Sequence, residues 1–538
     1  MRFSKSSHLL RNVAALLLLP LLICSCQWMK EDFDDAMADG NASRYINITV
    51  SVSASENPVT RAYPTGGETG DGLEKGFERE NVVNDVTLIF YEDNAGINTS
   101  NNETKVAFFA TYPVTKTDNY NGTHNHNLDD SNVGWTGTHQ ESNDNEVIYS
   151  TGDQLLNEDE LDVSKTYHAI VVANAPAALL SAITVNETTV AQVRDMVVAT
   201  VYDGTGVNTD AQNFVMASER DATVTFTNRK TDTANNTITY YFECIHIERL
   251  AARIDFWAKT KDPDDLNYTA VEYVDVSGND IPAGYRYKVG KKNKHGKNDI
   301  FVLTRITPFN LMVGNEYLLK RTNDDANRYL AKETTTNWVL DPYSAQSNGK
   351  NATTTHPDYL ASTLTNVRTT FANNFTVTLS ACQTPSTADA EGRKFTITEG
   401  SVTADNIILN YPRENTLNGG VSPLYYYATG LAFEGYYFKH SGNSDDEYHS
   451  HGNGAPMIFY HYLRHQGEGN LAYQALKDDE LSTTTLCPTT PAMNFGIVRN
   501  NIYRVSIEGI TVDEEDIKVT LNIKVKKWDK FVHTPIIM

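Results

Sequence analysis

A stretch of strictly alternating apolar and polar residues lies close to the start of the chain. In residues 46–53, which read INITVSVS, the apolar positions are Ile46, Ile48, Val50 and Val52. The positions between them are Asn, Thr and Ser. A period of two is typical of a β-strand with one buried and one exposed face. The pattern therefore predicts a half-buried strand over residues 46–53.

Similar strand patterns recur along the rest of the chain, separated by loops rich in Asn, Asp, Gly, Ser and Thr. Examples are NDVTLIFYED, TYHAIVVANAP, IERLAARIDFW, DNIILNYP and IKVTLNIKVKKW. Many short strands with such turns favour β-sandwiches. Helical patterns occur only in residues 175–200, where Thr189 is a candidate N-cap, and around residues 472–481. We therefore predict an all-β protein with minor helical excursions.

The length of the chain predicts more than one domain. A chain of 538 residues is long enough for two or three domains. A fresh run of strands begins shortly after Tyr240, and we expect a domain boundary there. Several loops between the strands are long, which is typical of surface elaboration or binding.

The first 25 residues have the features of a bacterial export signal. A basic start precedes an apolar run over residues 13–23, which is too short for a transmembrane helix. The run ends at Cys26 and resembles a lipobox, in which this cysteine becomes the acylated first residue of the exported protein. An ordinary signal peptide with a chance cysteine is the alternative. Two or more acyl chains anchor a protein stably to a membrane.

Charge and cysteine content narrow the classes of partner. The formal net charge is -23, and such a chain repels nucleic acid and anionic lipid. Only Cys244, Cys382 and Cys487 lie beyond the export signal. An odd, sparse set does not form a disulfide framework, although one pair could form. We expect each of the three to be buried in a core.

The sequence contains weak candidates for a metal site and none for a catalytic site. His449 with His451, and His461 with His465, have spacings that can bind Zn²⁺. The first pair lies in a polar loop, and residues four apart on a strand are about 13 Å apart, so we expect no metal. No nucleophile, P-loop or dinucleotide fingerprint occurs, so we expect neither an enzyme nor a cofactor. The tyrosine clusters PLYYYATG and EGYYFKH could form an aromatic platform that binds carbohydrate. We favour the alternative, in which these tyrosines pack within a sheet.

The last part of the chain carries two strand patterns and an apolar tail. Residues 517–525 alternate Ile, Val or Leu with Lys, Thr or Asn, and Trp528 and Phe531 follow them. The sequence then ends in PIIM. Termini are usually polar and frayed. An apolar tail needs to be buried, either in its own domain or in another molecule.

These residues carry a resemblance to a known family. GIVRNNIYRVSI, followed by a terminal strand that ends in Trp528, resembles the end of the major fimbrillins of type V pili. These pili are the lipoprotein-derived fimbriae of Bacteroidia-type bacteria. TYHAIVVANAP, IERLAARIDF and MIFYHYLRHQGEG resemble internal segments of the same family, closest to its short-fimbria major-subunit branch. The resemblance extends in layout over residues 26–538, except in the long loops.

The resemblance implies two transthyretin-like β-sandwich domains with long loops, and a lipidated precursor carried to the outer membrane. An arginine-specific protease then cuts the leader and removes its first strand, and the vacated groove accepts a strand from the next subunit. The regions implied for this chain are a lipoprotein signal peptide (1–25), a propeptide that contains a removable strand (26–61), and sandwich domains over 62–240 and 241–538.

The residues implied for each step can be named. Cys26 would carry the lipid, and the protease would cut between Arg61 and Ala62. Cutting at Arg44 would leave the strand attached, and Arg79 lies close to the next predicted strand. The remaining implied residues are Ile46, Ile48, Val50 and Val52 in the removable strand, and Trp528, Phe531, Val532, Ile536 and Ile537 in the donor segment.

Elementary physics agrees with such a scheme. Eight extended residues span about 26 Å. Removing a strand of this length exposes apolar side chains and unpaired backbone groups, which another chain's strand can cover. Because donor and groove are different surfaces, the contact is head-to-tail and forms a filament.

We therefore expect the structural major subunit of an adhesive cell-surface fimbrium that polymerises with copies of itself. The implied partners are accessory tip and anchor fimbrillins, the processing protease, and the outer membrane through the precursor's lipid, but not nucleic acid. One alternative is a non-polymerising surface lipoprotein that binds glycan or protein. The other is a tip fimbrillin, although the apolar tail argues against it, as Arg61 argues against an anchor subunit.

Overall fold

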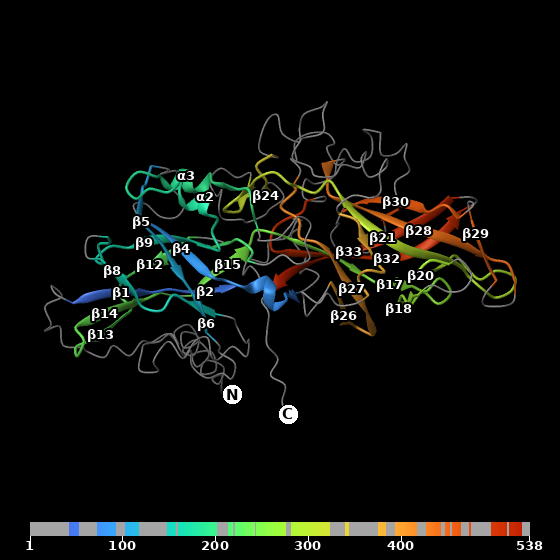
Figure 1. The fold of residues 1–538 in the computed structure, drawn as a ribbon, viewed down its shortest axis with the longest axis horizontal. Coiled ribbons are helices and arrows are strands. Elements are labelled where there is room, and N and C mark those ends of the chain that lie inside the picture. Colours follow the sequence, from blue (N-terminus) through green and yellow to red (C-terminus); the bar gives the residue numbers. More distant parts are fainter. Residues whose placement is uncertain are drawn as a thin grey trace, which may run out of the picture.

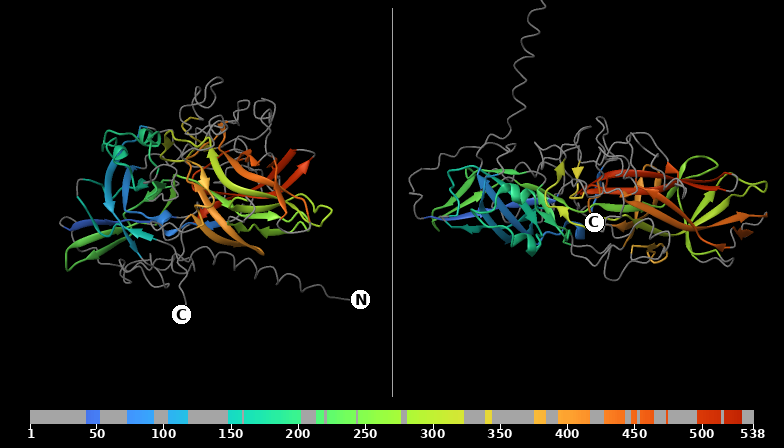
Figure 2. Two further views of the ribbon diagram at one scale, coloured as in Figure 1. Left: turned by 45° about the vertical axis from the view of Figure 1, so that its right-hand side comes forward. Right: turned by 90° about the horizontal axis from the view of Figure 1, so that it is seen from above.

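The computed structural model shows an all-β protein made of two lobes that lie end to end (Figures 1 and 2). The expected fold class, an all-β sandwich protein, is confirmed. The residues that the structure describes are 42–52, 73–92, 103–117, 148–157, 160–201, 213–218, 221–242, 244–275, 281–322, 339–343, 375–383, 393–416, 427–442, 447–451, 454–463, 473–474, 496–513 and 516–529.

The N-lobe consists of two sheets that share one core. Sheet 1 has the strand order β13 (Arg229–Asp232), β14 (Thr237–Tyr241), β1 (Ser43–Asn47) and β8 (Gln154–Leu156). Sheet 2 has the order β5 (Val106–Pro113), β4 (Asp85–Glu92), β9 (Tyr167–Ala173), β11 (Met216–Ser218), β15 (Ile245–Arg249), β2 (Thr49–Val52), β7 (Ile148–Ser150) and β6 (Thr115–Thr117), with β12 (Ala222–Val224) beside β9.

The C-lobe repeats this arrangement with two further sheets. Sheet 3 has the order β26 (Lys394–Glu399), β27 (Val402–Asn410), β16 (Arg253–Trp257), β32 (Asn501–Asp513), β33 (Asp516–Asp529) and β3 (Leu73–Lys75), with β31 (Tyr473–Gln474) beside β33. Sheet 4 has the order β19 (Tyr273–Val274), β20 (Gly284–Val289), β21 (Asp299–Phe309), β28 (Gly430–His440) and β29 (Tyr448–Ser450), with β25 (Val377–Thr378) beside β21 and β30 (Met457–Tyr462) beside β28.

Short elements decorate the sheets. Three small ladders pair β10 (Val197–Val198) with β22 (Glu316–Tyr317), β17 (Lys259–Lys261) with β18 (Tyr268–Ala270), and β23 (Arg321–Thr322) with β24 (Val339–Leu340). The helices are η1 (Glu78–Asn81), α2 (Ala177–Leu180) and α3 (Val190–Arg194). In the described part of the chain, no helix is long and apolar enough to span a membrane.

The helix predictions have different outcomes. Helices α2 and α3 confirm the pattern in residues 175–200, and the Gln192 amide donates to Thr189 Oγ1 at 3.3 Å, as expected of an N-cap. The helix expected around residues 472–481 is wrong for Tyr473 and Gln474, which form strand β31 against β33. The other residues of that stretch lie outside the described residues.

The chain passes from one core to the other at two adjacent alanines. Ala251 is buried in the core of the N-lobe and Ala252 in that of the C-lobe. The predicted domain division into residues 62–240 and 241–538 stays a prediction. A loop of the C-lobe also reaches back, because β22 pairs with β10 and Leu318 and Leu319 are buried in the N-lobe core.

The core of the C-lobe contains a buried histidine that makes a pH prediction possible. His461 lies in β30 with its ring against Phe433, and burial lowers its pKa from 6.5 to about 3. The folded protein therefore keeps this ring neutral, and the unfolded chain protonates it below pH 6.5. Its contribution to stability is present above pH 6.5 and is lost as the pH falls towards 3, by about 1.4 kcal/mol per pH unit.

We expect the difference in unfolding free energy between the wild type and His461→Leu to change with pH across this window. Urea unfolding at pH 7, 6, 5 and 4 measures it. The wild type should lose stability faster than the variant between pH 6 and 4. The exposed His449 provides the control His449→Leu, which should follow the wild type. Parallel curves for wild type and His461→Leu would contradict the prediction.

Candidate functional site

The predicted leader strand passes through the middle of both N-lobe sheets. We call residues 43–52, which comprise β1, Ile48 and β2, the leader strand. In sheet 1 it runs parallel to β14 and antiparallel to β8. In sheet 2 it runs parallel to β15 and antiparallel to β7. Its backbone is therefore paired on both sides, and Figure 1 shows it along one long side of the N-lobe.

A bulge between β14 and β15, which flank the leader strand on one side, divides the leader strand into β1 and β2. Asn47 pairs with Tyr241, and Val50 pairs with Ile245. The segment from β14 to β15 therefore has one more residue between these pairs than the leader strand has. At the same point the Ile48 amide donates to Thr151 Oγ1 at 3.0 Å. The strand predicted over residues 46–53 is thus present, but it begins three residues earlier and is interrupted at Ile48.

The apolar side of the leader strand is part of the N-lobe core. Ile46, Ile48, Val50 and Val52 are each at most 1% exposed. Burying such a side chain stabilises a fold by about 1.5–3 kcal/mol, so the four together contribute roughly 6–12 kcal/mol. This is as large as the whole stability of a typical domain. Cutting the chain after the leader therefore does not by itself release the strand.

The expectation that the leader strand is half-buried is wrong. Asn47 and Thr49 are 3% exposed and Ser51 is fully buried. Buried polar groups need hydrogen-bond partners, and Asn47 has two: its amide nitrogen donates to Asp153 Oδ1 at 2.9 Å, and Ser150 Oγ donates to its amide oxygen at 3.0 Å. The strand thus has one apolar and one polar face, both covered by protein.

The leader strand also joins two parts of the N-lobe. Among the described residues, the ladder partners of β7 and β8 are only the leader strand and β6. Strands β5 and β6 follow one another directly in the sequence but stand at opposite ends of the strand order of sheet 2. Sheet 2 is therefore strongly curved, and the leader strand is one of the strands that complete it. Without the leader, a slot would remain between β7–β8 and β14–β15, lined by unpaired backbone groups on both sides.

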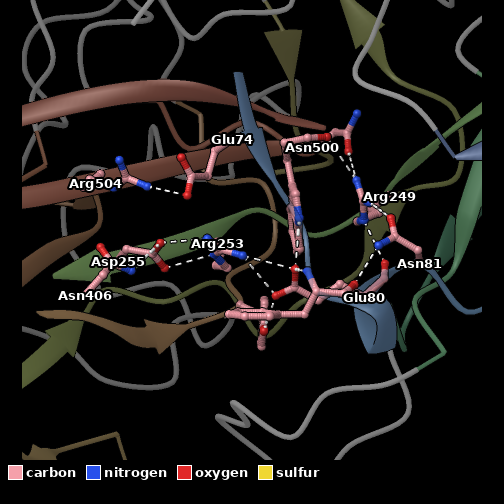
Figure 3. A network of polar contacts seen from close by, with 12 residues as sticks. Glu74, Glu80, Asn81, Arg249, Arg253, Asp255, Asn406, Asn500 and Arg504 are labelled. Atoms are coloured by element: carbon pink, nitrogen blue, oxygen red, sulfur yellow. Dashed lines mark hydrogen bonds and ion pairs between the residues drawn. The ribbon is translucent and has the colours of Figure 1, made fainter. Parts of the chain in front are cut away.

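A second feature lies where the two lobes meet. We call residues 73–81, which comprise β3 and η1, the strap. β3 runs parallel to the end of β33, where Leu73 pairs with Lys527. Figure 3 shows Glu80 of the strap, which is fully buried, facing Arg253 of the C-lobe. Its carboxylate accepts from Arg253 Nη1 at 3.1 Å and from the Phe77 amide at 2.7 Å.

Both lobes contribute to the cluster around the strap, which we call the clamp. Arg249 of the N-lobe donates to the Glu80 carbonyl at 2.8 Å and to the Trp528 carbonyl at 3.1 Å. Arg253 also binds Asp255 at 2.8 Å, and burial raises the pKa of the Asp255 carboxyl. Arg253 thus faces two carboxylates, whereas Arg249 donates to carbonyl and amide oxygens. Such pairing and hydrogen bonding make buried charge tolerable.

Trp528, predicted in the donor segment, lies in the clamp of its own chain. It is fully buried, its Nε1 donates to Glu80 at 3.2 Å, and its ring stacks on Tyr411 at 5.8 Å between centroids. The Arg249 guanidinium lies 4.5 Å from its ring centroid. The other predicted site residues lie outside the described residues: Cys26, Arg61, Ala62, Phe531, Val532, Ile536 and Ile537.

The remaining candidates from the sequence do not form a site. His449 and His451 are exposed, His461 is buried, and His465 lies outside the described residues. In the described part of the chain, no group of three or more His, Cys, Asp or Glu residues could hold a metal ion. Tyr437 of the EGYYFKH cluster is buried in sheet packing, as we favoured.

The cysteine expectations are met in part. Cys382 is buried and is a free thiol, whereas Cys244 is half-buried. Cys487 lies outside the described residues.

The clamp was missed in the sequence, although a signal for it exists. Arg249 and Arg253 stand four apart in the strand-like run IERLAARIDFW, which also contains Glu248 and Asp255, and both arginines are fully buried. A charge in a buried strand is expensive unless it is paired. Nothing local indicates that the partner is Glu80, because the ion pair spans more than 170 residues of sequence.

No family model and no curated protein matches the chain. Among solved structures, a proposed cell adhesion protein from Parabacteroides distasonis ATCC 8503 is 12% identical, with a TM-score of 0.37 over 92% of this chain and 99% of that chain. The tip fimbrial protein Mfa3 from Porphyromonas gingivalis with C-terminal truncation is 9% identical, with a TM-score of 0.34 over 90% and 100%. A fimbrilin (FimA) from Porphyromonas gingivalis W83 is 11% identical, with a TM-score of 0.32 over 92% and 99%.

The clamp makes a prediction about stability. Glu80→Gln keeps the shape of the side chain but removes the charge that faces Arg253. Breaking a buried pair in this way costs about 3–5 kcal/mol, and urea unfolding measures it. Glu92→Gln is the matched control, since Glu92 pairs with Lys165 at the surface, where a pair contributes at most about 1 kcal/mol. Equal losses in the two variants would show that the clamp does not stabilise the fold.

Proposed function

We propose that this chain is the precursor of a structural subunit of an adhesive cell-surface fimbrium, and specifically of its major subunit. In this proposal subunits join by strand exchange after proteolysis. The observation that carries it is the leader strand, which is paired on both sides within the N-lobe and is followed by a segment with a single arginine. A strand in this position can be separated from the chain by one cut, and its removal opens a slot for another strand.

The structure supports Arg61 as the position of the cut. A protease needs an accessible, extended backbone. Arg44 lies in β1 with its backbone paired on both sides, and Arg79 lies in η1 within the strap. Between these two arginines, Arg61 is the only Arg or Lys in the sequence of residues 53–72. A cut there separates the leader and leaves the strap in the mature chain.

The energetics favour exchange over an empty groove. The leader contributes roughly 6–12 kcal/mol through its apolar side chains alone, so the cut strand stays bound until another strand replaces it. Residues 530–538, if extended, span about 30 Å, which matches the leader strand in length. They include Phe531, Val532, Ile536 and Ile537, which supply apolar side chains for the replacement.

The clamp supports a donor segment that begins after Trp528. Trp528 is held in its own chain by Glu80, Tyr411 and Arg249. Pulling it out would break the clamp, so we place the donor segment after it, in residues 530–538. The rigid end of β33 then presents the donor from a fixed point beside the strap. Because donor and slot are different surfaces, subunits add head-to-tail, and this contact need not close into a ring.

The remaining steps of the proposal concern the cell surface. Cys26 carries the lipid that holds the precursor at the outer membrane, and an arginine-specific protease releases it. The mature chain then polymerises with copies of itself and with accessory tip and anchor fimbrillins. No step requires a catalytic residue, a metal or a cofactor of this chain.

The first test of the proposal concerns processing. Arg61→Ala should leave the precursor uncut and lipid-bearing, and fibres should be absent, since the leader stays covalently attached. Edman sequencing of wild-type fibre subunits should begin at Ala62. Arg44→Lys is the control and should be processed normally. Fibre subunits that begin at Glu80, or that still contain residues 46–53, would refute the assignment.

The second test concerns the donor. Removing residues 531–538 should give a secreted, cleaved and folded monomer that does not polymerise, because Trp528 and the clamp are kept. Size-exclusion chromatography and electron microscopy of surface material provide the readout. A truncated chain that still forms fibres would exclude the tail as donor. A wild-type chain that is cleaved and folded but stays a monomer and binds cells would favour a non-polymerising surface lipoprotein.

A further inference from the structure

The backbone pairing of the leader strand differs at one position from that of the residues around it. Thr49 is the first residue of β2 and lies opposite the bulge between β14 and β15. Asn47 and Val50 have ladder partners on that side, whereas Thr49 is paired only with Ser150 on the other side. Because Ile48 and Thr151 form a hydrogen-bonded pair, Thr49 and Ser150 form a non-hydrogen-bonded one, which does not use the Thr49 amide. Within a sheet, proline is tolerated at the first residue of a strand or at a bulge, and it disrupts a paired interior position. The slot therefore has one place where a proline is accepted.

The tail of this chain contains one proline, Pro535, between apolar residues. Resting on the proposed function, we propose that the tail of a second copy enters the slot in one register, with Pro535 in the place of Thr49. The tail then runs in the direction of the leader. In this register Val532, Thr534, Ile536 and Met538 take the places of Ile46, Ile48, Val50 and Val52, and His533 and Ile537 take those of Asn47 and Ser51.

The polar side of the slot supports the same register independently. The place of Asn47 is lined by Ser150 and Asp153, which hydrogen-bond to its amide. In the proposed register His533 lies there, and an imidazole can donate to a carboxylate. A shift of one residue in either direction brings Val532 or Thr534 to this place and turns the imidazole towards the apolar core.

Other registers also misplace the proline. A shift of one residue puts Pro535 at Val50, which is paired with both Ile245 and Tyr149. The opposite shift puts it at Ile48, whose amide donates to Thr151 Oγ1. Shifts of two residues keep the faces but put the proline at paired positions, Asn47 or Ser51. Hydrophobicity alone does not exclude the registers shifted by two residues. The position of the proline excludes them.

At one place in the proposed register, a large apolar side chain replaces a small polar one. Ile537 would lie in the place of Ser51, which is fully buried. The slot must widen there, so Ile537→Ser should be accepted at least as well as the natural residue.

Disulfide cross-linking between copies tests the register. Thr151 donates its amide to the Ile48 carbonyl, so Ile48 and Thr151 form a hydrogen-bonded pair, and Ser51 and Ile148 form a non-hydrogen-bonded one. The Cα atoms of such a pair lie about 4.5 Å apart, within the range of a disulfide. Two full-length precursors are used, one with Ile148→Cys and one with a cysteine in the tail, both with Cys244→Ser.

The two precursors are mixed, cut with an arginine-specific protease and oxidised. Ile537→Cys should cross-link to Ile148→Cys at least about ten times more than Ile536→Cys does. Preferential cross-linking of Ile536→Cys, or tail-dependent oligomers without either cross-link, would overturn the register and leave strand exchange intact. If the uncrosslinked, cut precursors form no tail-dependent oligomers, the proposed function itself fails, and this inference fails with it.

Moving the proline is a second test that does not need cysteines. Pro535→Ala should polymerise like the wild type, since Thr49 itself is not a proline. Ile536→Pro puts a proline at the place of Val50 and should weaken association at least about a hundredfold. Ile536→Ala loses the same side chain without a proline and is the matched control. Equal behaviour of Ile536→Pro and Ile536→Ala would contradict the proposed register.

Discussion

The backbone pairing of residues 43–52 on both sides is the interaction on which the N-lobe depends. Strands β7 and β8 meet the rest of the described sheets through this strand and β6. Its apolar side chains belong to the lobe's core, and its polar side chains are covered as well. A strand in the middle of a sheet cannot be lost without a replacement, because both neighbours would then carry unpaired backbone groups. In the proposed function, this requirement couples loss of the leader to binding of another strand.

The clamp performs a separate task at the junction of the lobes. Glu80 binds Arg253 of the C-lobe and, through its carbonyl, Arg249 of the N-lobe. The same carboxylate accepts a hydrogen bond from the Trp528 indole at the end of β33. A buried, hydrogen-bonded cluster of this kind is costly to break but contributes little beyond what apolar packing would. Its role here is positional, because it connects the strap, both lobes and the end of β33.

The sequence predicted the parts of this structure that follow from local pattern. Alternation identified the strand at residues 46–53, and Thr189 identified the start of α3. Alternation did not reveal that Asn47 is buried, because this depends on Ser150 and Asp153, more than 100 residues away. The clamp was missed for the same reason. Trp528 was expected to be part of the donor from its apolar surroundings, yet its indole N–H and ring have partners in Glu80 and Tyr411 of its own chain.

The central claim is that the leader stays in its slot until another strand replaces it. Native mass spectrometry after cleavage at Arg61 tests this most directly, by comparing the full-length chain with one that lacks residues 531–538. The account predicts that the shortened chain retains the leader fragment as a non-covalent complex, whereas the full-length chain loses it as oligomers form. Equal loss of the fragment from both chains, or its retention in the oligomers, would contradict the account.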